Sequence, residues 1–208
     1  MKSLGAATQV DAAERFRREM APSPGPSCTI PNAKAASLRD LFDYWKSLPA
    51  VRGIPDAADF RPTAIARWLP DATIMEICSP DMAIYRLAGT RVAERMGHDP
   101  TGVNVLDIVA DGYRRQAARD LHEIVYRPCG LLLRYVNTYS SGRMATIESL
   151  YLPLRPPAGS NPRVIAVHAP ETTLQYTEPM KTSSIADAVQ CAIWIDIGQG
   201  TPRDVQRP

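Results

Sequence analysis

The chain has 208 residues, of which 45% are hydrophobic and 22% are charged, and its formal net charge is +2. These values are typical of a globular protein, so the sequence predicts a buried core. Basic residues are spread along the chain and not clustered, which argues against strong nucleic-acid binding. No apolar run reaches the roughly 18–20 residues that a membrane helix needs.

The four cysteines, Cys28, Cys78, Cys129 and Cys191, are far apart and form no C-x-x-C pair, and the three histidines are scattered. This pattern argues against a metal site and against a disulfide framework. It favours reduced thiols, and we therefore expect a cytoplasmic location.

Residues 1–36 are predicted to form a flexible arm, because the segment 21–27 (APSPGPS) has no core-forming residue. A helix is predicted from Ser37, which can act as its N-cap, to Pro49, which ends it. Its apolar positions recur at helical spacing and form one stripe, made of Leu38, Leu41, Phe42, Trp45 and Leu48. Such a stripe must pack either on the body of the domain or on a second subunit.

Strands and helices follow in a fixed order. Residues 73–78 and 83–88 alternate like strands around the turn 79–81 (SPD). A short helix is expected at 91–96, capped by Thr90 and ended by Gly97, and a longer one from its cap Asp111 to Arg127. Three strands are predicted at 131–139, 143–154 and 163–168, and a further short one at 192–197. This order indicates an α+β domain.

Several segments carry a family resemblance: 41–48 (LFDYWKSL), 54–62 with its Ile54-Pro55 and Pro62, 68–70 (WLP), 85–91 (YRLAGTR) and 152–154 (LPL). Together with Gly97 and 101–102 (TG), they resemble a PAS-like family of short stand-alone proteins found mainly in alphaproteobacteria and largely uncharacterised. The resemblance covers about residues 37–170.

The resemblance implies a PAS fold, an antiparallel sheet of about five strands with helices over one face, preceded by an amphipathic helix. The domain division becomes a flanking helix and connector at 37–70, a PAS core at 71–170 and a C-terminal tail at 171–208. The resemblance also implies a pocket between sheet and helices. Dimerisation or coupling is implied for the preceding helix, with candidates Leu38, Leu41, Phe42 and Trp45. No catalytic residues come with the family.

Strand alternation suggests which side chains face the pocket. If Glu76 and Arg86 face water, their neighbours on the two strands face the helices. The pocket candidates are Met75, Ile77, Tyr85, Leu87, Leu121, Leu133, Tyr135 and Ile147. The alternative is a solid core without a ligand, because apolar lining alone does not distinguish the two. On the opposite face, Arg134 and Glu148 are candidates for a cross-strand ion pair.

The motifs of common enzymes fail at particular positions. The glycines of 97–102 have phosphate-loop spacing, but Val103 stands where Lys is required. His122-Glu123 lacks a second histidine, because position 126 is Tyr. Two interpretations of His122 are open. It is either an axial haem ligand on the longer helix or an ordinary surface histidine.

The leading hypothesis is a sensory or regulatory PAS module that binds a small, largely apolar molecule and signals through a partner protein or a dimer. The alternative is a ligand-free module for protein–protein interaction or dimerisation. An enzyme is the weakest hypothesis, because the motif checks fail. Neither nucleic acid nor a membrane is an expected partner.

Overall fold

The computed structural model describes residues 33–202. The predicted arm, residues 1–36, lies outside the described residues apart from its last four. The main sheet has six strands in the order β4-β3-β7-β6-β5-β8, and every neighbouring pair is antiparallel. The strands are β3 (Ala72–Ser79), β4 (Met82–Ala88), β5 (Gly130–Thr138), β6 (Arg143–Leu154), β7 (Arg163–Tyr176) and β8 (Ser184–Ile195). A small separate ribbon joins β1 (Ala50–Val51) and β2 (Ile54–Pro55).

The sixth strand comes from the segment that was expected to be a tail. The predicted boundary at residue 170 falls inside β7, which continues beside β6 to the pair Arg143–Tyr176. β8 then runs along β5 from Ser184 to Ile195 and forms an edge of the sheet. The sheet is therefore wider than the five strands expected. The predicted short strand at 192–197 overlaps β8 only at residues 192–195.

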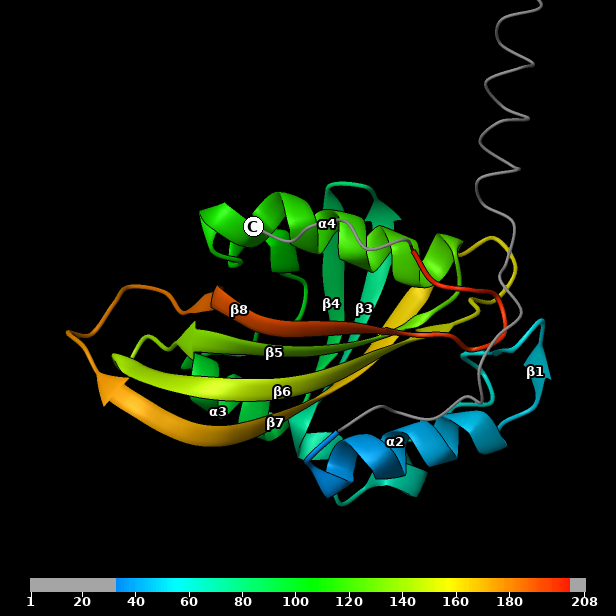
Figure 1. The fold of residues 1–208 in the computed structure, drawn as a ribbon, viewed down its shortest axis with the longest axis horizontal. Coiled ribbons are helices and arrows are strands. Elements are labelled where there is room, and N and C mark those ends of the chain that lie inside the picture. The colour runs from blue at the N-terminus through cyan, green and yellow to red at the C-terminus, as the bar shows by residue number, and fades with distance from the viewer. Residues whose placement is uncertain (1–32, 203–208) are drawn as a thin grey trace, which may run out of the picture.

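Helices cover both faces of this sheet, as Figure 1 shows, with α4 on one side and α2 on the other. The helices are α2 (Ala36–Ser47), α3 (Thr90–Met96) and α4 (Asp111–Tyr126). Short 3-10 turns, η1 (Pro62–Ile65), η2 (Leu69–Asp71) and η3 (Val105–Asp107), complete the connections. The buried apolar residues accordingly form two clusters, one on each face of the sheet.

The amphipathic stripe of α2 packs on the sheet of its own chain. Leu38 and Leu41 are fully buried, and Phe42 and Trp45 are each only 3% exposed. The indole N–H of Trp45 donates a hydrogen bond to the carbonyl oxygen of Pro153 on β6, at 2.8 Å. Of the two alternatives for the stripe, the structure therefore shows the domain body. While α2 stays docked, these four residues are not accessible to a second subunit.

The start of α2 is held by a distant side chain and not by the predicted cap. Ser37 lies inside the helix, and the N-cap is Ala35, which has no capping side chain. The carboxylate Oε2 of Glu148 on β6 accepts hydrogen bonds from the backbone N–H groups of Lys34 and Ala35, at 3.0 and 3.1 Å. The predicted ion pair between Arg134 and Glu148 is wrong for this reason, and Arg134 pairs with Glu171 instead.

The ends of the other two helices differ slightly from the predictions. Thr90 and Asp111 are the first residues of α3 and α4, so neither is the N-cap; those positions are Gly89 and Ala110. Gly97 ends α3 as predicted, with φ of +81°, in the left-handed region that glycine adopts without strain. α4 ends at Tyr126, one residue before the predicted end.

Candidate ligand cavity

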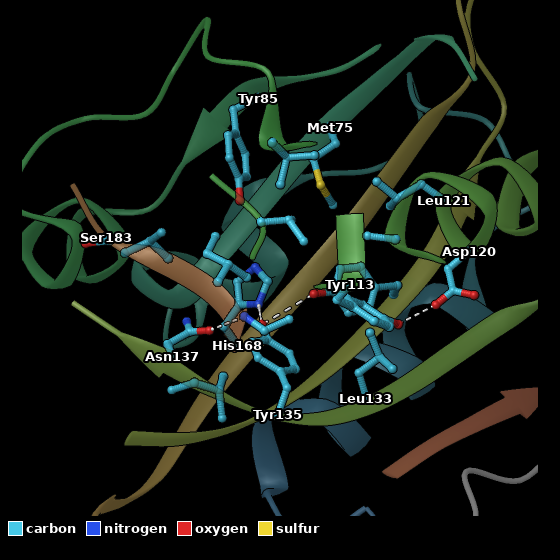
Figure 2. A pocket seen from close by; sticks show the side chains of 18 of the residues that line it. Met75, Tyr85, Tyr113, Asp120, Leu121, Leu133, Tyr135, Asn137, His168 and Ser183 are labelled. Carbon is cyan, nitrogen blue, oxygen red and sulfur yellow. Dashed lines mark hydrogen bonds between the residues drawn. The ribbon is translucent and has the colours of Figure 1, made fainter. Parts of the chain in front are cut away.

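A cavity of about 70 Å³ lies between the sheet and the helical layer of α3, η3 and α4. Its apolar wall comes from both layers, with Ala117, Leu121 and Ile124 on α4 and Leu131 and Leu133 on β5. Figure 2 shows that side chains from several strands and from α4 point into the same space. The geometry provides a largely apolar enclosure with a few polar groups, which is the usual composition of a small-molecule site.

Six of the eight predicted pocket residues line the cavity: Met75, Tyr85, Leu121, Leu133, Tyr135 and Ile147. Ile77 belongs to the same buried cluster but does not reach the cavity. Leu87 lies opposite Ile74, whereas Tyr85 lies opposite Met75, so Arg86 is an extra residue on β4. This bulge breaks the two-residue alternation and turns Leu87 toward the other face, where Ile74 packs.

A polar row crosses the floor of the cavity over four neighbouring strands. Thr73 on β3 lies 2.9 Å from His168 Nε2 on β7, and Ser149 on β6 lies 2.9 Å from His168 Nδ1. The Tyr135 hydroxyl on β5 lies 2.9 Å from Ser149 Oγ and 3.3 Å from His168 Nδ1. Tyr151 extends the row through a long 3.4 Å contact between its hydroxyl and that of Tyr135. Both ring nitrogens of His168 are therefore occupied by hydroxyl groups.

The groups of this row are neutral. Burial lowers the pKa of His168 to about 3, with Arg95 acting in the same direction and Asp71 against it. Burial also raises the pKa values of Tyr135 and Tyr151. Near neutral pH the row therefore contains an uncharged imidazole and protonated phenols, which bind a ligand through hydrogen bonds and not through charge.

Tyr85 contributes a hydroxyl from the opposite side of the cavity. The side chain is 4% exposed, and Figure 2 shows its hydroxyl directed toward the space above His168. Within residues 33–202 no group forms a hydrogen bond with this hydroxyl. Burial raises its pKa, with the Tyr135 hydroxyl acting in the same direction, so it too is a protonated donor.

Two charged side chains line the cavity, and both have partners. Arg95 on α3 bonds through Nη1 to Asp71 Oδ1 at 2.6 Å. Asp120 on α4 accepts hydrogen bonds from the Tyr113 hydroxyl at 2.5 Å and from Gln116 Nε2 at 2.8 Å. Because both side chains have partners within the protein, neither needs an oppositely charged group on a ligand to compensate its burial.

The haem interpretation of His122 does not fit the geometry. His122 is not among the cavity-lining residues, and its ring stacks on Tyr126 one turn along α4, with 4.2 Å between the ring centroids. His168 does line the cavity, but both of its nitrogens are bonded within the polar row. Among residues 33–202 no cluster of three or more His, Cys, Asp or Glu side chains forms a metal site.

Sequence reasoning missed most of the polar lining. His168, Tyr151, Tyr113, Asp120 and Asn137 line the cavity and were not among the candidates. Alternation along β6 from Ile147 would have reached Tyr151, and alternation along β7 from Val164 would have reached His168. An apolar pattern does not mark these polar residues, because a polar side chain on a strand is ordinarily expected to face water.

The comparisons with known proteins agree with this architecture. The model of the PAS domain family matches residues 33–168, which is more than half of the chain. The chain therefore belongs to the PAS domain family, and the α+β PAS fold predicted from the sequence is confirmed. Members of this family are generally sensory or regulatory modules. No curated protein matches the chain. In the range 33–202 the structure has no helix with the length and apolar character needed to span a bilayer.

Proposed function

We propose that this protein is a sensory or regulatory PAS module that binds a small molecule in the cavity and signals through a partner protein or a second copy. The cavity carries this proposal, because it combines an apolar wall with a few polar groups. One of these, the Tyr85 hydroxyl, has no hydrogen-bond partner among the described residues. A solid core has no physical reason to keep an unsatisfied hydroxyl directed into open space.

The route for a signal is β6, which faces both layers. Ile147, Ser149 and Tyr151 lie on the cavity side of this strand, and Glu148 between them holds the start of α2. A ligand that shifts β6 changes the position of the Glu148 carboxylate relative to the N–H groups of Lys34 and Ala35. We therefore propose α2 as the coupling helix, acting by how firmly it is docked on the sheet.

A non-catalytic role is part of the proposal. Ser149 and His168 are in contact at 2.9 Å, as in a nucleophile–base pair. However, Ser149 is fully buried, the third group of the row is the Thr73 hydroxyl instead of a carboxylate, and the low pKa of His168 makes it a weak base. These features support a binding site and argue against hydrolysis.

Native mass spectrometry of protein purified from its own host, under non-denaturing conditions, tests ligand binding. We expect a retained small molecule, and we expect Ala117→Leu to release it, because Ala117 lines the cavity on α4. Ala118→Leu is the matched control, since Ala118 is adjacent but does not line the cavity. A purified protein without any bound molecule, together with no thermal shift across a metabolite library, would contradict the proposal.

Hydrogen exchange tests the coupling step. Removing the ligand should speed exchange in residues 34–47, and Glu148→Leu should produce the same faster exchange whether or not ligand is present. Glu148→Gln keeps an acceptor oxygen, so its exchange rate in residues 34–47 should lie between those of the unchanged protein and Glu148→Leu. Unchanged exchange in α2 in all of these states would separate ligand binding from the proposed output.

A ligand-free interaction or dimerisation module is the second candidate. Three large apolar side chains, Leu174, Tyr176 and Met180, lie exposed near the turn between β7 and β8, at 51%, 72% and 42%. Exposed apolar groups that gather in one segment favour contact with another protein. Light scattering over a concentration series, with Tyr176→Ser and Leu174→Ser, tests this; a monomer at every concentration would count against self-association.

A cytoplasmic location belongs to the proposal as well. The cysteines within the described residues, Cys78, Cys129 and Cys191, are free thiols, which supports a reducing compartment. Fractionation of host cells, with the protein followed by antibody, tests the location.

A further inference from the structure

The polar row of the cavity is a continuous line of hydrogen-bonding groups. Its order is Thr73, His168, Ser149, Tyr135 and Tyr151, so it has five members and four consecutive contacts. Each of the four hydroxyls supplies one donor proton, and the neutral imidazole supplies one more. Four contacts use four protons, so one proton of the row has no acceptor within it. The additional 3.3 Å contact from Tyr135 to His168 Nδ1 closes a triangle but gives this proton no acceptor.

Burial decides where the surplus proton lies. Thr73 and Ser149 are fully buried, and among the described residues the Thr73 hydroxyl bonds to His168 alone. A buried hydroxyl proton without an acceptor is costly, so the Thr73 hydroxyl donates to His168 Nε2. His168 then carries its proton on Nδ1 and donates to Ser149, which donates to Tyr135. The surplus proton falls on the Tyr135–Tyr151 pair, whose hydroxyls lie 3.4 Å apart with either able to donate to the other, and both residues line the cavity.

Tyr85 provides a second donor without an acceptor. Its hydroxyl has no hydrogen-bond partner within residues 33–202 and is directed into the same cavity. Asp120, the carboxylate that lines the cavity, already accepts from Tyr113 and Gln116. The walls of the cavity thus offer two phenolic donor protons that their own chain does not satisfy, one on Tyr85 and one on the Tyr135–Tyr151 pair.

Resting on the proposed function, we propose that the cavity recognises a small uncharged carbonyl compound, whose oxygen accepts hydrogen bonds from Tyr85 and from the Tyr135–Tyr151 pair. An alcohol fits less well, because it brings another donor proton to a site that already has a surplus. A carboxylate fits less well because Arg95, the cation among the cavity-lining residues, is already paired with Asp71. The Asp120 carboxylate also lines the cavity, and burying a second anion in these apolar surroundings is unfavourable.

The size of the cavity limits the ligand. An apolar cavity of about 150 Å³ holds benzene, and this one has about 70 Å³. In proportion, about three non-hydrogen atoms fit inside it, and a molecule of about four or five fits because the cavity is not fully enclosed. The carbonyl oxygen lies toward the polar row, and the hydrocarbon part contacts Leu121, Leu133 and Ile124.

Three probes with the same number of non-hydrogen atoms test the proposal: butanone, 2-methyl-1-butene and propanoate. The alkene has the shape of butanone with a methylene group in place of the oxygen. NMR titration of the ligand-free full chain, following the methyl signals of Leu133 and Ile147, should show butanone binding about three- to tenfold more tightly than the alkene, the value of one or two net hydrogen bonds. Propanoate should bind more weakly than butanone.

Variants connect the preference to these hydroxyls. Tyr85→Phe should lower the affinity for butanone and leave the affinity for the alkene unchanged, and the double variant Tyr135→Phe/Tyr151→Phe should do the same. Tyr176→Phe, which changes an exposed tyrosine outside the cavity, is the matched control and should change neither. Imidazole ¹⁵N shifts should show His168 protonated on Nδ1, and an Nε2–H tautomer would contradict the proton count directly.

The outcomes separate this proposal from the proposed function. Equal binding of butanone and the alkene would overturn carbonyl recognition and leave cavity binding standing. Tightest binding of propanoate would show that the ligand is an anion, and would overturn the uncharged class. Binding of none of the three would overturn the carbonyl proposal at this size, whereas the molecule retained in native mass spectrometry tests the proposed function independently.

Discussion

The two faces of the six-stranded sheet are built from alternating residues of the same strands, yet they differ in kind. On the α2 face, Leu38, Leu41, Phe42 and Trp45 fill the space over β6 and β7, and each is at most 3% exposed. On the α4 face, tyrosines and His168 replace aliphatic side chains, and a cavity remains. Rigid rings anchored by hydrogen bonds do not collapse into the open space as flexible aliphatic chains do. The α2 face thus contributes closely packed apolar side chains to stability, whereas the α4 face gives up part of this packing where the cavity lies.

The largest effect is expected on the packed face. Trp45→Ala should lower the free energy of unfolding by about 3–5 kcal/mol, because it removes a large buried side chain and leaves the Pro153 carbonyl without its donor. Urea unfolding followed by circular dichroism measures this. Trp68→Ala is the matched control, since the Trp68 indole bonds to Asp40 at the surface. A comparable loss in both variants would contradict the central role of the α2 stripe.

The next effect concerns pH and the cavity face. His168 has a native pKa of about 3, against 6.5 when it is free of the fold. Between these values the unfolded state binds a proton that the native state does not. The contribution of His168 to the free energy of unfolding is therefore fully present above pH 6.5 and is lost as the pH falls toward 3. At pH 5 the loss amounts to about 2 kcal/mol.

A variant isolates this contribution from other titrating groups. His168→Gln keeps a donor and an acceptor but does not titrate, so its unfolding free energy should depend less steeply on pH between 6.5 and 4. Urea denaturation at a series of pH values measures the difference in slope. Parallel curves for both proteins would mean that the pKa of His168 is the same in the native and the unfolded states.

Leucines on the two faces give a smaller, direct comparison. Leu41→Ala on α2 should lower the free energy of unfolding by about 1–2 kcal/mol more than Leu121→Ala on α4 does. Leu121 borders a cavity and already lacks some packing contacts. Both residues lie on helices, so helix propensity cancels. An equal or larger cost for Leu121→Ala would show that the cavity closes in solution.

The contrast between the faces also explains what could be predicted from the sequence. Periodicity placed Leu38 to Trp45 on one stripe and brought Met75, Tyr135 and Ile147 to one face, because these inferences need only local spacing. The bulge at Arg86 was not foreseeable, since it depends on how β4 pairs with β3. The polar row required the strand order, which sets Thr73, His168 and Ser149 side by side although they are far apart in the chain. The same holds for the contact of Glu148 with residues 34 and 35.

The smallest expected effect tests the idea that the cavity face carries unsatisfied hydroxyls. Tyr85→Phe should change the free energy of unfolding by no more than about 0.5 kcal/mol, because the lost hydroxyl has no partner among the described residues. Tyr135→Phe, also buried and also lining the cavity, should cost about 1–2 kcal/mol, because its hydroxyl bonds to Ser149 in the middle of the row. The same chemical change then gives two results, depending on whether the structure uses the hydroxyl. A cost for Tyr85→Phe as large as that for Tyr135→Phe would show that Tyr85 is satisfied within the fold, and that the cavity lacks one of the two donors on which carbonyl recognition depends.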